Sequence, residues 1–98
     1  MNLNLYWGDL HSHCSISYGH GTAEQALTRA MQQLDFCSVT GHAFWPDMPT
    51  DTKQYKDIIE YHNQGFATCA KNWEELIRVQ EEATVPGHFI AFPSYEWH

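Results

Sequence analysis

The sequence of 98 residues predicts an α/β fold in which parallel strands alternate with helices, in the order β-α-β-α-β. Three observations lead to this class. Short apolar segments with the composition of strands occur three times, stretches with helical periodicity separate them, and each segment rich in candidate site residues directly follows a predicted strand. Strands joined through helices pair in parallel by right-handed crossovers, so we expect one parallel sheet.

The first strand is predicted over residues 3–10, where leucine and tryptophan alternate with asparagine and tyrosine. Residues 11–21 form a loop rich in serine, glycine and histidine. Thr22 then begins a helix, because Gln25 three residues later completes a capping box. Apolar side chains follow with helical spacing as far as Leu34.

A second short strand is predicted over residues 35–40, ending at Gly41-His42. Residues 43–50 contain two prolines and are expected to form a loop.

Residues 51–83 have a helical pattern, in which Gly65 either divides two helices or weakens one. The third strand is expected over residues 88–95. Pro93 is unfavourable inside a central strand, which predicts an edge or a bulge at that point.

The length allows one domain, residues 1–98. A parallel sheet of three strands has two open edges and too little surface to cover its helices. We therefore expect the chain to be the incomplete N-terminal portion of a larger (β/α) barrel. Completion of the sheet by other chain segments, or by a homo-oligomer, is the alternative.

The composition excludes several functions and favours a metal site. The formal net charge is −7 and lysine and arginine are few, which argues against nucleic-acid binding. The three cysteines are widely spaced and form no zinc-ribbon or disulfide pattern. With no apolar run that suits a membrane or a signal peptide, we expect a cytoplasmic protein that does not bind membranes. Seven histidines are an excess that indicates metal binding.

The segment at residues 9–13, Asp-Leu-His-Ser-His, is the strongest feature. In an extended segment, residues two apart point to the same side, so His11 and His13 can reach one metal ion. The alternative is two surface histidines that share a loop. Asp9 falls on the same side, and either orients a histidine or ligates, or caps the end of the strand.

Three further residues follow predicted strands or lie near such a position. His20 lies between two glycines and is either a ligand or an exposed loop histidine. His42 ends the second strand and is either a ligand or a turn residue, and Glu96 ends the third strand as either a metal carboxylate or an ordinary exposed side chain. Imidazole with carboxylate suits Zn, Mn or Fe.

These motifs resemble a known family. Residues 7–15 (Trp-Gly-Asp-Leu-His-Ser-His-Cys-Ser) are similar to the opening motif of the PHP (polymerase and histidinol phosphatase) superfamily, most closely to an uncharacterised branch beginning Tyr-x-Gly-Asp-Leu-His-x-His. Residues 21–26 (Gly-Thr-Ala-Glu-Gln-Ala) resemble the start of its first helix. Residues 34–42 resemble its Leu-Asp-Phe-x-x-x-Thr-Asp-His segment, and residues 92–97 resemble the strand that ends in a glutamate ligand.

The resemblance implies a distorted (β/α)7 barrel that holds two or three divalent ions and hydrolyses phosphate esters with a metal-activated water. It matches the first ligand pair to His11 and His13, a loop ligand to His20, and further ligands to His42 and Glu96. Asp9 and His20 are the candidate catalytic residues. Gly41 departs from the family pattern, which has aspartate there, and the later ligand motifs have no counterpart in this sequence.

We therefore expect a metal-dependent hydrolase, in particular a phosphoesterase that acts on a small phosphorylated molecule. An amidohydrolase-type barrel, which also opens with His-x-His, is an alternative. A non-catalytic metal-binding or interaction module from a truncated barrel is another. The 98 residues alone are expected to be inactive, because they supply only part of such a site.

Overall fold

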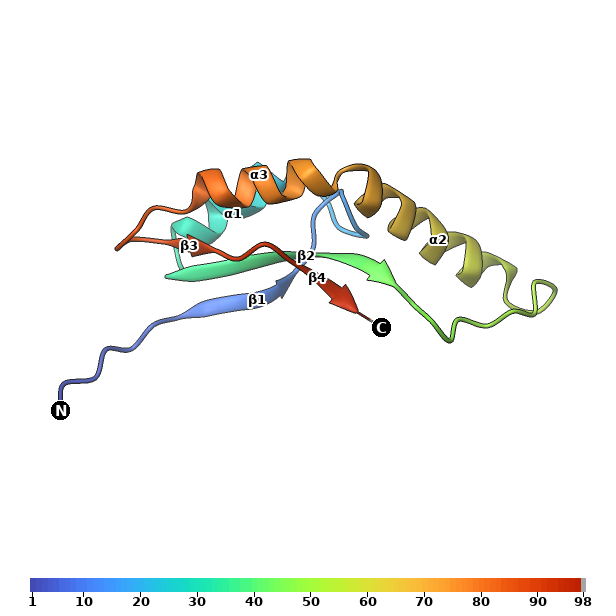
Figure 1. Cartoon of the computed structure of the whole chain (residues 1–98), viewed down its shortest axis with the longest axis horizontal. Helices are drawn as coiled ribbons and strands as arrows, with labels where there is room; N and C mark the ends of the chain where they lie inside the picture. The colour runs from blue at the N-terminus through green and yellow to red at the C-terminus, as the bar shows by residue number, and fades with distance from the viewer. Residues whose placement is uncertain (98) are drawn as a thin grey trace.

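A computed structural model describes residues 1–97 of the chain. Three helices lie on one side of a small sheet, as Figure 1 shows. Along the chain the elements are β1 (Gly8–Ser12), α1 (Ala23–Met31), β2 (Phe36–Phe44), α2 (Lys56–Lys71), α3 (Trp73–Ala83), β3 (Ile90–Ala91) and β4 (Ser94–Trp97). The predicted α/β class is confirmed, with the second helical connection divided into two helices and the third strand into two short ones.

The sheet is parallel, with β2 at its centre. β1 pairs with one edge of β2, while β3 and β4 both pair with the other edge. The predicted third strand is thus interrupted at Pro93, which has no N–H to donate to the ladder. At the interruption the Ser38 hydroxyl donates to the carbonyl oxygen of Phe92 (2.7 Å) and also contacts the hydroxyl of Ser94. The prediction of an irregularity at Pro93 is confirmed.

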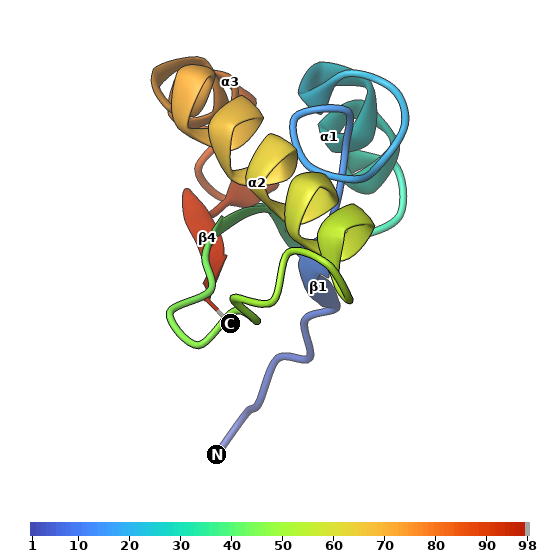
Figure 2. The ribbon, with the colours of Figure 1, turned by 90° about the vertical axis from the view of Figure 1, so that its right-hand side faces the viewer.

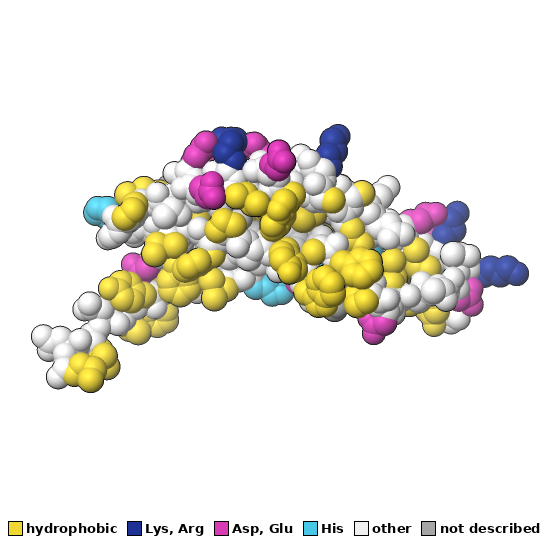
Figure 3. Space-filling view, in the orientation of Figure 1, with side chains coloured by type: hydrophobic (Ala, Val, Ile, Leu, Met, Phe, Trp, Pro, Cys, Tyr) yellow, Lys and Arg dark blue, Asp and Glu magenta, His cyan; other side chains and the backbone are white. Residues whose placement is uncertain are grey.

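The helices cover one face of the sheet only (Figure 2). Val39 of β2 is buried in one core cluster with Leu27 of α1 and Leu76 of α3, and each of the three is at most 2% exposed. Within residues 1–97 no helix covers the opposite face, on which Leu10 and Phe92 line a shallow hollow and stay exposed. Figure 3 shows the apolar side chains gathered below the helix layer, whereas Lys and Arg lie on the helices and near the start of α2.

The N-terminal strand begins later than predicted. Residues 3–7 lie outside β1, although their side chains alternate as in a strand. A strand requires a partner, and β2 begins at Phe36, which pairs with Gly8. The last backbone bond before this pair joins the amide of Asp35 to the carbonyl of Trp7, at 2.7 Å. The preceding residues project away from the sheet (Figure 1).

Two other boundaries differ from the prediction. β2 continues through Gly41 and His42 to Phe44, because β4 pairs with this second half. The helical stretch begins at Lys56 rather than at residue 51, and it breaks at Asn72 rather than at Gly65.

The capping box between Thr22 and Gln25 is present, which confirms the predicted start of α1. None of the helices within residues 1–97 combines the length and the apolar character needed to cross a bilayer. Cys14, Cys37 and Cys69 are buried free thiols, and burial raises the pKa of each.

Candidate metal centre

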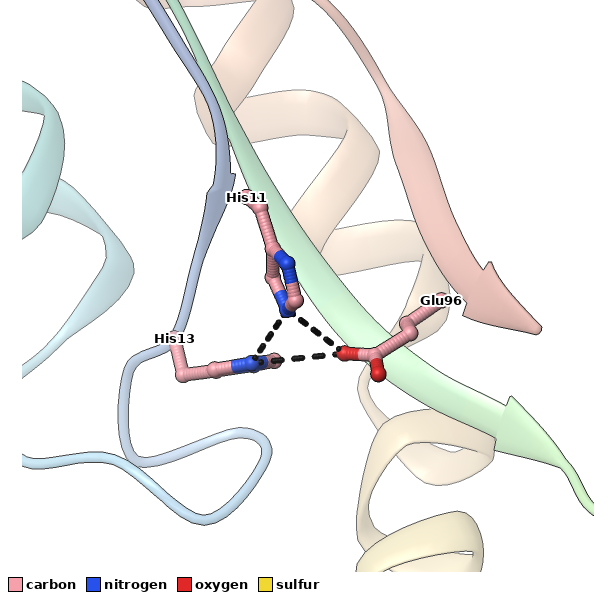
Figure 4. Close-up of side chains that lie close together, drawn as sticks. All are labelled: His11, His13 and Glu96. Atoms are coloured by element: carbon pink, nitrogen blue, oxygen red, sulfur yellow. Dashed lines mark hydrogen bonds and ion pairs between the residues drawn. The ribbon is translucent and has the colours of Figure 1, made fainter. Parts of the chain in front are cut away.

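Four predicted ligand side chains meet at the carboxyl ends of the strands. His11 lies on β1 and His13 directly follows it, His42 lies on β2 and Glu96 on β4. Because these strands are parallel, their carboxyl ends are neighbours at one edge of the sheet. Figure 4 shows His11, His13 and Glu96 pointing toward a common position.

The ligand atoms of His11, His13 and Glu96 all lie within 4.8 Å of one another, whereas Nε2 of His42 contacts Oε2 of Glu96 from outside this group. Oε2 of Glu96 lies 2.9 Å from Nε2 of His11, 3.3 Å from Nε2 of His13 and 3.2 Å from Nε2 of His42. The Nε2 atoms of His11 and His13 are 3.1 Å apart. Atoms bound tetrahedrally at the usual Zn–N distance lie about 3.4 Å from one another. Two imidazoles and one carboxylate at these separations fit one divalent transition-metal ion, and His42 adjoins them through the same oxygen of Glu96.

The backbone near His11 is irregular and Asp9 supports it. The register between β1 and β2 shifts between Asp9 and Ser12. Oδ1 of Asp9 accepts the backbone N–H of His11 at 2.9 Å, which fastens the chain at this shift. Asp9 and His11 both lie inside β1, so this contact is a local bond within the strand rather than a cap at its end. A catalytic role for its carboxylate stays a prediction.

His42 is the most enclosed of the four, with 6% exposure. Its Nδ1 lies 2.5 Å from Oγ of the buried Ser17, and the same oxygen accepts the backbone N–H of His42 at 2.9 Å. Ser17 therefore holds the histidine at two points. Ser17 is not among the residues predicted from the sequence, because nothing distinguishes it from the other serines of its loop.

The Ser17 hydroxyl suits either neutral tautomer of His42. A hydroxyl has one donor and two acceptor positions, and the backbone N–H uses one of the acceptors. When Nε2 carries the proton and donates to Glu96, Ser17 donates to Nδ1. When Nε2 binds a metal, the proton moves to Nδ1, and Ser17 accepts it. If Nε2 of His42 binds a metal, the ion would thus replace the proton without displacing the ring.

We expect Ser17→Ala to weaken metal binding by about 10- to 100-fold, as is usual when the support of a metal-binding histidine is lost. The variant should also lose about 1–3 kcal/mol of unfolding free energy, because two buried groups of His42 lose this partner. Competition with a chromophoric chelator measures the affinity, and urea unfolding measures the stability. The exposed Ser15→Ala is the control from the same loop. Unchanged affinity in Ser17→Ala would show that the hydroxyl does not support the ligand.

His13 is held differently from His42. Its ring stacks on that of His42, with centroids 4.6 Å apart and planes 19° apart. Its Nδ1 is buried and has no hydrogen-bond partner within residues 1–97. Stacking, rather than a hydrogen bond to Nδ1, orients this ring in the described part of the chain.

Within residues 1–97 the other histidines lie apart from this group. His20 is exposed in the turn before α1, and the ligand atoms that lie together within residues 1–97 do not include its ring. Its ligand and catalytic roles stay predictions. His62 lies on α2, where its Nδ1 is 2.8 Å from the hydroxyl of Tyr18. His88 is exposed before β3, and His98 lies outside the described residues.

Gly41, which departs from the family pattern, faces away from the ligand atoms. A Cβ at this position would lie 2.3 Å from Sγ of Cys69 on α2 and 3.7 Å from Cδ2 of Leu76 on α3. Successive residues of a strand point to opposite faces, so His42 points to the site while Gly41 faces the helices. An aspartate here would face the core of this chain rather than the metal centre.

Comparisons with known proteins add no relative. No protein-family model matches the chain, and searches of curated proteins and of solved structures found none that matches it.

Proposed function

We propose that this chain carries the first ligands of a metal-dependent hydrolase, and that it is the N-terminal portion of a distorted (β/α)7 barrel of the PHP type. The convergence of three imidazole Nε2 atoms on Oε2 of Glu96 carries the proposal. The strand order supports the barrel: β1, β2 and β3 are adjacent in sequence order, and both helical connections lie on one face (Figure 1). In (β/α) barrels the helices likewise lie on one face of the sheet and the strands follow in sequence order.

Phosphate-ester hydrolysis is the reaction that this ligand set suits best. Three neutral imidazoles and one carboxylate leave a bound divalent ion with a net charge of about +1, which attracts phosphate oxygens. Such an ion supplies a Lewis acid and a water that is acidic enough to act as a nucleophile near neutral pH. His11, His13, His42 and Glu96 would hold it, and Zn, Mn or Fe fits these ligands. Two or three ions would require ligands in addition to these four.

The residues of this chain have separate parts in the proposed reaction. His42 fixes the buried side of the site through Ser17, whereas His11 is 64% exposed at the side chain and borders the solvent, from which a substrate enters. Glu96 contacts all three imidazoles and lowers the positive charge of the centre. The Lys and Arg side chains visible in Figure 3 lie on the helices and near the start of α2, so the metal would be the main attraction for a small phosphorylated substrate in this part of the site.

Metal content and turnover together test the proposal. Protein purified without chelator should contain a transition metal by elemental analysis, and His11→Ala and Glu96→Ala should each lose most of it. The matched controls are His88→Ala and Glu74→Ala, which alter exposed residues outside the ligand group. If both ligand variants keep the wild-type metal content, the ligand assignment is wrong.

Turnover separates the alternatives that share this metal centre. Hydrolysis of an aryl phosphate is measured with the longest chain that contains the sequence, because the 98 residues hold only part of the proposed site. Metal-dependent turnover that is lost in Glu96→Ala supports the phosphoesterase. Turnover of an amide or cyclic amide instead supports an amidohydrolase, and metal without any turnover supports a non-catalytic module.

A further inference from the structure

Tyr18 has an unusual backbone conformation beside the metal centre. Its φ is +58°, the only positive φ of a non-glycine residue within residues 1–97. This left-handed region is unfavourable for a residue with a bulky side chain. Such conformations persist where the surrounding contacts over-determine them, which makes the contacts of this side chain informative.

The side chain of Tyr18 joins the metal centre to α2. Its ring lies against that of His42, with centroids 4.0 Å apart. Its hydroxyl lies 2.8 Å from Nδ1 of His62, and its ring stacks on Tyr61 at 4.6 Å. One aromatic residue of the loop between β1 and α1 thereby contacts both a predicted ligand and two successive residues of the helix.

Helix α2 is shaped to receive this ring. A Cβ at Gly65 would lie 2.2 Å from Cε1 and 2.7 Å from the hydroxyl oxygen of Tyr18. Glycine is unfavourable in the interior of a helix, and Gly65 lies in the middle of α2. The close approach of Tyr18 accounts for a glycine at this position.

We propose that Tyr18, seated on Gly65, is a positioning residue that fixes the imidazole of His42 and thereby couples α2 to the metal centre. The ring of His42 is enclosed between His13 on one side and Tyr18 on another, while Ser17 holds its Nδ1. With these contacts in place, Nε2 of His42 is directed to Glu96. The functional importance of this arrangement rests on the proposed role of His42 as a ligand.

The test uses a substitution whose effect on the helix alone would be favourable. Gly65→Ala should strengthen α2 by helix propensity, but its methyl group displaces the ring of Tyr18. We expect the affinity for Co²⁺, measured by its visible absorption, to fall about 10-fold or more, with a changed spectrum. Asn63→Ala, at an exposed position of the same helix, also raises helix propensity but does not displace the ring of Tyr18. This variant should bind Co²⁺ like the wild type.

A second variant covers the case in which Gly65→Ala does not fold. Tyr18→Gly removes the ring but suits the left-handed backbone, so the loop keeps its conformation. It should lose Co²⁺ affinity to a similar extent. Wild-type affinity and spectrum in Tyr18→Gly, or in a folded Gly65→Ala, would overturn the positioning role.

A metal-free measurement distinguishes this proposal from the proposed function. The imidazole ¹⁵N signals of His42 in the apo protein should shift in Gly65→Ala and Tyr18→Gly but not in Asn63→Ala. If the wild type binds no Co²⁺ while these signals shift, the metal site is wrong and the positioning of His42 stands. If the signals do not shift, Tyr18 does not position His42.

Discussion

Gly41→Asp is expected to lower the free energy of unfolding by about 3 kcal/mol or more. This holds although the family pattern that the sequence resembles has aspartate at this position. The added Cβ would lie 2.3 Å from Sγ of Cys69, and the carboxylate would enter the layer between β2 and the helices. A buried charge without a partner is among the most destabilising changes that a core can receive. Urea unfolding followed by circular dichroism measures the loss.

Two further variants separate crowding from charge. Gly41→Ala adds only the crowded methyl group and should cost about 1–3 kcal/mol. Cys69→Gly removes the side-chain atoms nearest to the added methyl group. In the Cys69→Gly background, Gly41→Ala should therefore lower the free energy of unfolding by less than it does in the wild type. A Gly41→Asp protein with wild-type stability and additional bound metal would contradict the structure, because its carboxylate would then face the ligand atoms.

The convergence of these four side chains could be predicted because it follows from chain order and strand geometry. His11 and His13 are two residues apart in an extended segment, and His42 and Glu96 lie near the ends of the next two predicted strands. Parallel pairing brings such positions to one edge whatever the details of the core. The structure accordingly places all three imidazoles in contact with Oε2 of Glu96.

The supporting contacts could not be predicted because they depend on packing between distant segments. Ser17 and Tyr18 look like ordinary loop residues, and their partners lie 25 to 44 positions further along the chain. Gly65 was recognised as unusual in a helix, but its reason, the ring of Tyr18, is visible only in three dimensions. The sequence therefore shows that the glycine is unusual, but it does not show that the ring of Tyr18 is the reason.

The boundary errors have the same physical origin. Alternation in residues 3–7 predicted a strand, but a strand also needs a partner, and β2 does not extend that far. Conversely, β2 continues beyond Gly41 because β4 pairs with it there. The break at Asn72 carried no proline or glycine signal, and the helices change direction there in Figure 1.

Zinc should stabilise the folded chain strongly if the centre binds it. At a free Zn²⁺ concentration 100 times the Kd, a ligand that binds only the folded state adds about 2.7 kcal/mol. For a domain of this size, this corresponds to a rise in Tm of about 10–20 °C. Differential scanning calorimetry with and without Zn²⁺ measures the rise.

Glu96→Gln tests whether this stabilisation comes from the proposed centre. The amide has almost the shape of the carboxylate but lacks its charge, and Oε2 contacts all three imidazoles. The Zn²⁺-dependent rise in Tm should therefore fall to a few degrees at the same Zn²⁺ concentration, while Glu74→Gln on the exposed side of α3 should keep the full rise. A full rise in Glu96→Gln would mean that zinc stabilises the chain through other ligands. In that case the contacts around Glu96 would be an ordinary histidine–carboxylate cluster, held together by protons rather than by a metal.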